Sequence, residues 1–197
     1  TLLGFAMQMA LIFVTGHALA SAPIINRQLD RLAGLARTPG QAIIMVTLVA
    51  LVGCWVNWGF GLVIGAVFAR ALARKVDGVD YPLLVASAYS GFLVWHGGLA
   101  GSIPLTIATP GHFSEDQIGI IPTSQTIFAG YNLIIVVALF VIMPLINRWM
   151  MPSEDESVFV SREQLSEPED RDRDAIERPA DRLENSTLLS MLVGIPG

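Results

Sequence analysis

The sequence is short of charged residues and lacks them completely over long stretches. Charged residues make up 15% of the 197 residues, whereas a soluble domain averages about 25%. Residues 1–26, 38–69, 83–110 and 126–147 contain no Lys, Arg, Asp or Glu. Such stretches are atypical of a soluble domain and approach or exceed the roughly 20 apolar residues that a transmembrane helix needs. We therefore predict an integral membrane protein.

Cysteine is almost absent too. The single cysteine, Cys54, lies inside an apolar run, which excludes a disulfide framework and any cysteine-rich metal site. The three histidines have no metal-like spacing, so we expect no metal and no cofactor. The formal net charge of −5 arises mainly from the tail after residue 151, and it gives no indication of nucleic-acid binding.

The chain opens without an initiator Met or a basic n-region, and it ends in a short apolar run. We interpret it as a fragment of a longer protein. The expected fold class is an all-α, polytopic helical bundle. The expected parts are spans at 2–25 and 126–147, a re-entrant hairpin at 41–69, a broken helix at 83–107, a charged cytoplasmic linker at 151–186 and the start of a further membrane segment at 187–197.

Residues 41–69 predict a helical hairpin. As one helix they would run about 43 Å, beyond the ~30 Å hydrocarbon core. Asn57, Trp58 and Gly59 suit a turn at the centre, and basic residues flank both ends, which the positive-inside rule places on the same side. We expect each arm to be too short to span, so that the turn stops at membrane depth. One long tilted helix remains the alternative.

Residues 83–107 predict a helix that is broken at membrane depth. Gly97, Gly98 and Gly101 lower helix propensity, and Pro104 removes a backbone donor. Broken helices of this kind are where carriers hold their cargo. The following loop, 108–125, has acidic but no basic residues, as an external loop should. With this topology all 12 Lys and Arg fall on one side.

No charged side chain lies in the four apolar segments, so a carboxylate proton relay is absent from this half of the protein, and neutral groups must bind the substrate here. Helix N-termini offer N–H groups and a partial positive charge to a small carboxylate. Ser102, expected at the start of the second half-helix, is our first choice for that contact. The predicted substrate-binding residues are Asn57, Trp58, Gly59, His96, Gly97, Gly98, Gly101 and Ser102.

Several of these residues have a structural alternative. Asn57 can cap exposed backbone instead of touching substrate. Gly61 and Gly65 fit helix packing better than substrate contact. Ser90 can bond back to its own helix instead of lining a cavity.

The strings NWGFGLVIG (57–65) and YPLLVASAYSGFLVWHGGLAGSIPLTIATPGHF (81–113) resemble the bacterial short-chain fatty acid transporter family, as do the opening GFAMQMALIFVTGHALA and VIMPLINRWMMP. The resemblance covers nearly the whole chain. It implies a carrier for acetoacetate, butyrate and similar monocarboxylates in the bacterial cytoplasmic membrane. It also implies a fold of inverted repeats with re-entrant hairpins, and full-length members are much longer.

We therefore expect a secondary transporter and not an enzyme. It would work by alternating access in the lipid bilayer, with H+ or Na+ as a coupling cation and the oligomeric state open. One alternative is a carrier for another small organic anion. A membrane-embedded enzyme using His17 and His96 is a second alternative, although no carboxylate partner is at hand.

Overall fold

The computed structural model describes residues 22–161, together with residues 7, 10, 11, 14–16, 18 and 165. Most of the predicted span at 2–25 and His17 lie outside the described residues, as do the predicted segment at 187–197 and most of the predicted linker. Contacts divide the chain into residues 1–165 and 166–197, and all described residues belong to the first unit.

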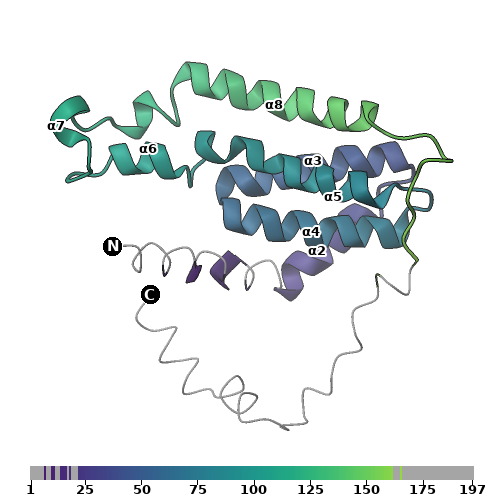
Figure 1. The fold of residues 1–197 in the computed structure, drawn as a ribbon. Helices are drawn as coiled ribbons and strands as arrows, with labels where there is room; N and C mark the ends of the chain where they lie inside the picture. Colours follow the sequence, from purple (N-terminus) through teal and green to yellow (C-terminus); the bar gives the residue numbers. More distant parts are fainter. Residues whose placement is uncertain are drawn as a thin grey trace, which may run out of the picture. The chain divides into compact units, whose positions relative to one another are not determined.

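The described part is helical and contains no strands (Figure 1). The confirmed fold class is therefore a polytopic helical membrane protein, although the re-entrant arrangement stays a prediction. The elements are α2 (Pro23–Ala33), α3 (Pro39–Val56), α4 (Trp58–Lys75), α5 (Tyr81–Ser90), the 3-10 helix η1 (Gly91–Gly97), α6 (Ser102–Ile107), α7 (Glu115–Ile118), the 3-10 helix η2 (Thr123–Gln125) and α8 (Gly130–Trp149).

Side-chain caps set several helix starts. The Thr38 hydroxyl accepts the Gln41 N–H over 3.3 Å, directly before a proline at the first position of α3. The Asp80 carboxylate likewise accepts the Leu83 N–H over 2.7 Å at the start of α5. The hairpin and the broken helix therefore begin where local sequence satisfies the first backbone donors.

Helix α3 lies at the centre of the bundle, in contact with α4, α5, η1 and α8 (Figure 1). One group of buried side chains joins α2, α3, α4 and α5, with Phe68 and Leu72 among its fully buried members. A second group has Leu51 and Cys54 of α3 and Val94 of η1 at its centre, and partly buried residues of α8 such as Phe140 pack against it. Because α3 is apolar on every face, this central position is the one its sequence favours.

Gly61 allows α3 and α4 to pack closely, and Gly65 also lies where these two helices meet. A Cβ at Gly61 would lie 2.2 Å from the Cys54 nitrogen, so the two backbones meet there. A Cβ at Gly65 would make an ordinary 3.4 Å contact with the Ala50 Cβ. Both positions therefore act in helix packing, which is the structural alternative predicted for them.

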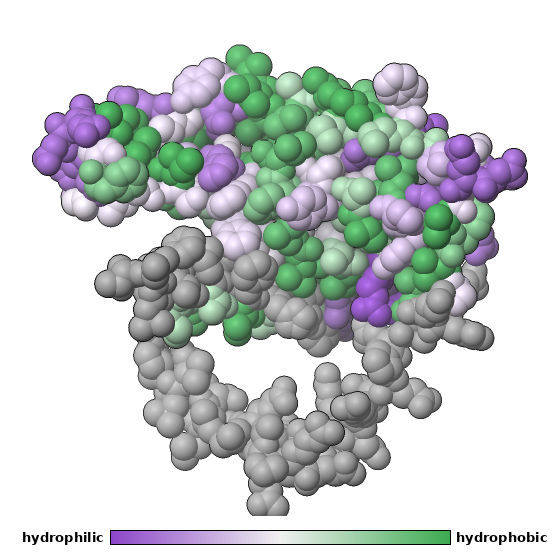
Figure 2. Space-filling model, in the orientation of Figure 1, coloured by the Kyte–Doolittle hydropathy of each residue, from purple (hydrophilic) through white to green (hydrophobic). Residues whose placement is uncertain are grey.

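Three helical stretches of the described part are long and apolar enough to cross a membrane: Pro39–Val56, Tyr81–Ile107 and Gly130–Trp149. Figure 2 shows hydrophobic residues gathered between two hydrophilic ends of the visible face. Many of the exposed large side chains on α8 are apolar, such as Ile134, Val137 and Val141. This surface fits contact with lipid or with further membrane helices better than contact with water.

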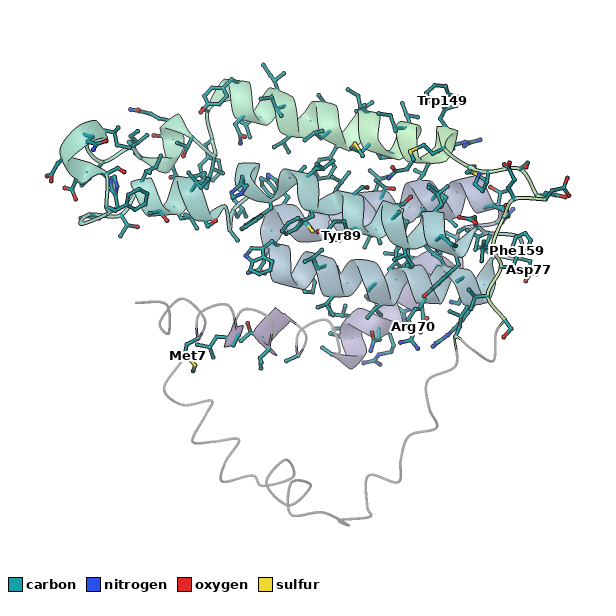
Figure 3. The ribbon with its side chains drawn as sticks, in the orientation of Figure 1. Met7, Arg70, Asp77, Tyr89, Trp149 and Phe159 are labelled. Atoms are coloured by element: carbon teal, nitrogen blue, oxygen red, sulfur yellow. The ribbon has the colours of Figure 1, made fainter. Side chains whose placement is uncertain are left out.

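The structure gathers the basic flanks of the helices at one end. The ammonium of Lys75, at the end of α4, donates to the Asp30 carbonyl in α2. A Cβ at Gly40, at the start of α3, would lie 3.3 Å from the Arg148 Nε at the end of α8. In Figure 3, Asp77, Trp149 and Phe159 lie at this same end. The flanks of the hairpin are thus together, as the positive-inside argument requires.

The lengths of the hairpin arms differ from the prediction. Helices α3 and α4 have 18 residues each, which is about 27 Å, close to the hydrocarbon thickness. The expectation that each arm is too short to span is therefore wrong for α3, which meets the length and composition of a span. The helical break at Asn57 is present, and its depth in the bilayer stays a prediction.

The chain after α8 is packed against the bundle as far as it is described. The second Asp80 carboxylate oxygen accepts the Val158 N–H over 2.8 Å, and the Tyr81 N–H donates to the Val158 carbonyl over 3.0 Å. Leu165 is buried, and its carbonyl accepts from Arg74. The first residues of the predicted linker are therefore held in place; residues 166–197 lie outside the described part.

Candidate functional site

The turn of the hairpin consists of one residue, Asn57, between the end of α3 and the start of α4. Its backbone is extended, and its side-chain oxygen accepts the Phe60 N–H over 3.1 Å. Asn57 thus caps α4, which is the structural alternative weighed for it. Trp58 and Gly59 belong to the buried first turn of α4 and not to a loop. The positive end of the α4 dipole lies here.

The broken helix runs as α5, then as the tighter η1, then through a bend at 98–101 into α6. The predicted interruption is therefore present. The bend is compact: the Gly101 N–H donates to the Gly98 carbonyl over 3.1 Å, and a Cβ at Gly101 would lie 2.6 Å from the His96 carbonyl. Glycine is needed at both ends of this bend because other backbone atoms occupy the space of a side chain.

The two interruptions lie against each other. The Leu99 N–H donates to the carbonyl of Trp55, in the last turn of α3, over 2.7 Å. A Cβ at Gly98 would lie only 2.3 Å from the same carbonyl oxygen. The bend therefore packs on the end of α3 with backbone against backbone, and the residues predicted in the hairpin turn and in the break form one region.

Aromatic rings fill the space between the hairpin turn and η1. The ring centroids of Trp58 and Trp95 are 5.4 Å apart, and those of Phe92 and Trp95 are 4.9 Å apart. Tyr89, labelled in Figure 3, stacks on Phe92 at 5.9 Å. These contacts fix how η1 sits on α4 and give the region an apolar wall.

Two predicted residues lie differently from expectation. Ser102 is exposed and is the first residue of α6; the preceding residue, Gly101, occupies the cap position, where no side chain caps the helix. Because α6 has only six residues, its dipole is small. His96 is also exposed, and its ring stacks on Trp95 at 4.1 Å. Asn57, Trp58, Gly59 and Gly98 therefore form the inner part of the predicted site, with His96 and Ser102 at its outside.

Asn132 of α8 completes the inner part, and the sequence argument missed it. Its side-chain N–H group donates to the Gly97 carbonyl over 3.0 Å and to the Ile127 carbonyl over 2.8 Å. It thereby fastens α8 to the break. The sequence did indicate this role, because Asn132 places an amide within a largely apolar span. Polar groups in such spans usually bond to other parts of the protein.

A second polar group lies between α3, α5 and α8, and the sequence argument considered only Ser90 among its members. The Asn147 side chain donates to the Thr47 hydroxyl over 3.0 Å and to the Ser90 hydroxyl over 2.8 Å. Ser90 also donates to the Ser87 carbonyl over 2.7 Å, so the predicted back-bond is present, but Ser90 faces a polar partner as well.

The chemistry of the region is neutral. Within the described residues, no group of three or more His, Cys, Asp or Glu side chains is placed to hold a metal ion. Apart from the exposed His96 imidazole and the tryptophan indoles, the polar atoms near the two interruptions are backbone N–H and C=O groups, amides and hydroxyls. These neutral groups bind and orient a small ion by hydrogen bonding, and they supply no general acid or base.

Comparison with known proteins gives concordant matches over the whole chain. The family described as "Short chain fatty acid transporter" matches residues 1–197. A protein of Escherichia coli strain K12, provisionally named a short-chain fatty acid transporter, is 49% identical over 100% of this chain and 45% of its own length. A protein of Haemophilus influenzae with the same name is 43% identical over 100% of this chain and 46% of its own length.

The chain thus spans about half the length of the curated relatives it matches. No solved structure matches it.

Proposed function

Since the chain belongs to the short-chain fatty acid transporter family, we propose that the full-length protein carries short-chain fatty acids, acetoacetate and butyrate among them, across the bacterial cytoplasmic membrane. The family is one of transporters, which favours transport over catalysis. The single observation that carries the proposed site is the contact between the two helix interruptions through Trp55 and Leu99.

The inner part of the site would bind the carboxylate. Helix α4 starts at Trp58, so the positive end of its dipole lies at this turn. That end of the dipole favours an anion. The aromatic side chains Trp58, Phe92 and Trp95 supply apolar surface for a short alkyl chain. His96, Gly97, Gly101 and Ser102 would line the approach to the site from the outer side.

Alternating access would act through the same contact. The bend at 98–101 is joined to α3 by a backbone hydrogen bond, and Asn132 of α8 bonds to Gly97, the last residue of η1 before the bend. A substrate that bound between the bend and α4 would change how these elements pack, and the site would then open toward the other side. Residues from the remaining half of the full-length protein would complete the site.

The test is counterflow of labelled butyrate in proteoliposomes containing the full-length protein. We expect exchange that unlabelled acetoacetate inhibits and a dicarboxylate does not. Absence of exchange with every short-chain acid would refute the transport proposal. Inhibition by the dicarboxylate alone would favour a carrier for another organic anion.

Variants of Asn57 separate binding from capping. Asn57→Ser keeps a side-chain cap, whereas Asn57→Ala removes it at a cost of about 1 kcal/mol. If the amide binds substrate, both variants lose exchange; if it only caps α4, Asn57→Ser retains exchange.

Ser102→Ala is compared with Ser124→Ala, which changes an exposed serine before α8. Exchange that survives Asn57→Ala and Ser102→Ala together would refute the site while leaving the carrier intact.

A further inference from the structure

The polar group between α3, α5 and α8 has a defined hydrogen-bond pattern. The Thr47 hydroxyl donates to the Ile43 carbonyl over 2.7 Å, and the Ser90 hydroxyl donates to the Ser87 carbonyl over 2.7 Å. Each hydroxyl has then used its hydrogen, and its lone pairs face the Asn147 amide, which donates to both. The hydroxyl oxygens of Thr47 in α3 and Ser90 in α5 therefore both face the Asn147 amide.

Burial raises the free-energy cost of leaving any polar atom of this group without a partner. Thr47 and Ser87 are 0% exposed and Asn147 is 5% exposed. The Ser87 hydroxyl has no hydrogen-bond partner among the residues that the structure describes. A buried polar group without a partner costs about 1–3 kcal/mol. Ser87 lies one helical turn before Ser90, hence on the same face of α5. This face of α5 therefore carries one buried hydroxyl oxygen that no hydrogen bond of the described residues uses.

The oxygens of the group give it its electrostatic sign. Helix α5 passes directly into η1 after Ser90, and the Gly91 N–H bonds to the Ala88 and Tyr89 carbonyls. The acceptors left for a ligand are therefore the lone pairs of the buried hydroxyls and, if its side chain flips, the Asn147 amide oxygen. Oxygen atoms gathered in this way favour a cation.

We propose that the side chains of Thr47, Ser87, Ser90 and Asn147 form a Na+ site. If the Asn147 side chain flips, its amide oxygen takes the place of its N–H group. The Thr47 and Ser90 hydroxyls then keep their bonds to the backbone carbonyls. Three hydroxyl oxygens and one amide oxygen then face the ion.

The absence of carboxylates favours a monovalent cation over a divalent one. Helices α3 and α5 carry no acid or base along their lengths, and neither does the stretch of α8 before Arg148. Neutral oxygens suit a monovalent cation, whereas Mg2+ and Ca2+ are normally bound with carboxylates. No group of the cluster titrates near neutral pH, so it has no place for a transported proton. The coupling of this ion to substrate rests on the proposed function, whereas the binding of Na+ does not.

If the cluster only holds the helices together, the response of the protein to Ser87→Ala and to Na+ should differ. Polar side chains commonly hold membrane helices together by hydrogen bonds. In that case Ser87 takes no part, its replacement by Ala is neutral or stabilising, and Na+ has no specific effect.

The experiment measures Na+ binding to the full-length protein in detergent, without transport. Thermal unfolding is followed against NaCl, KCl or choline chloride at constant ionic strength, and bound 22Na+ is counted directly. We expect saturable stabilisation by NaCl alone. Ser87→Ala, which removes no side-chain hydrogen bond of the described residues, should weaken apparent Na+ affinity about tenfold or more.

Thr47→Val provides a second variant, which removes another ligand at similar volume. The matched control is Thr106→Val, because Thr106 also donates to its own helix but is exposed and outside the cluster. Equal stabilisation by the three salts, or a Na+ response unchanged in Ser87→Ala and Thr47→Val, would overturn the site. Na+ binding without butyrate exchange in wild-type protein supports the site and refutes only the transport proposal.

Discussion

The backbone N–H of Leu99 donates to the carbonyl of Trp55 over 2.7 Å, so the bend of the broken helix is bonded to the last turn of α3. This bond joins two interruptions that lie more than 40 residues apart in the sequence. It depends on Gly98, which brings the two backbones together without a side chain between them.

Gly98→Ala should disturb this contact, because the new Cβ would lie 2.3 Å from the Trp55 carbonyl oxygen. Overpacking of this kind costs about 1–3 kcal/mol. We expect a lower thermal-unfolding midpoint and a strong loss of butyrate exchange. Gly130→Ala is the control, since nothing lies within 4 Å of a Cβ there. Equal behaviour of the two variants would contradict the prediction.

Asn132→Leu should loosen α8 from the break. It removes two hydrogen bonds, to the Gly97 and Ile127 carbonyls, and leaves those acceptors without this donor. The expected loss in unfolding free energy is about 1–3 kcal/mol. Tyr131→Phe, which removes one exposed bond to the Gln125 carbonyl, should cost much less. Thermal unfolding of the full-length protein compares the two, and a larger loss in Tyr131→Phe would speak against the role of Asn132.

Gly61 and Gly65 offer a matched pair for the packing of α3 against α4. Gly61→Ala places a methyl group 2.2 Å from the Cys54 nitrogen, whereas Gly65→Ala meets side chains at 3.4 Å and beyond. We expect Gly61→Ala to prevent stable folding and Gly65→Ala to be tolerated. Yield and monodispersity after size-exclusion chromatography measure this, and the reverse order would exclude the observed hairpin packing.

Cysteine labelling tests the topology. In a Cys54→Ala background, Thr38→Cys and Asp77→Cys flank the hairpin and are exposed. A membrane-impermeant maleimide should label both from the cytoplasmic side only, because the flanks lie at the same end of the bundle. Labelling from opposite sides would exclude the hairpin.

The same labelling separates a re-entrant hairpin from a full-depth one, which the flanks alone do not distinguish. Asp116→Cys, in the loop predicted to be external, calibrates reaction from outside. If the turn stops within the bilayer, Asn57→Cys should resist the reagent from outside, where Asp116→Cys reacts. Rapid labelling of both from outside would show that the arms cross completely.

Both helix interruptions could be predicted because their signals are local. Asn57 and Gly59 suit a turn wherever the chain goes, and the glycines at 97, 98 and 101 oppose a continuous helix on their own. The arm lengths were missed because the helices extend to Pro39 and Lys75, beyond the boundaries drawn from composition.

The packing of the site could not be predicted in this way. The exposure of Ser102 depends on the direction in which the bend leaves η1, and the Asn147 cluster depends on which helices are neighbours. A better indication was present in α8: Asn132 and Asn147 lie 15 positions apart, within about 60° on a helix, which marks one inward face. Both amides do contact neighbouring elements in the structure.

Asp80 serves two parts of the chain with one carboxylate, since one oxygen caps α5 and the other holds the Val158 N–H. An axial shift of α5 would therefore pull residue 158 with it while both bonds last. The described segment after α8 is thus coupled to the start of the broken helix, and the two are expected to move together.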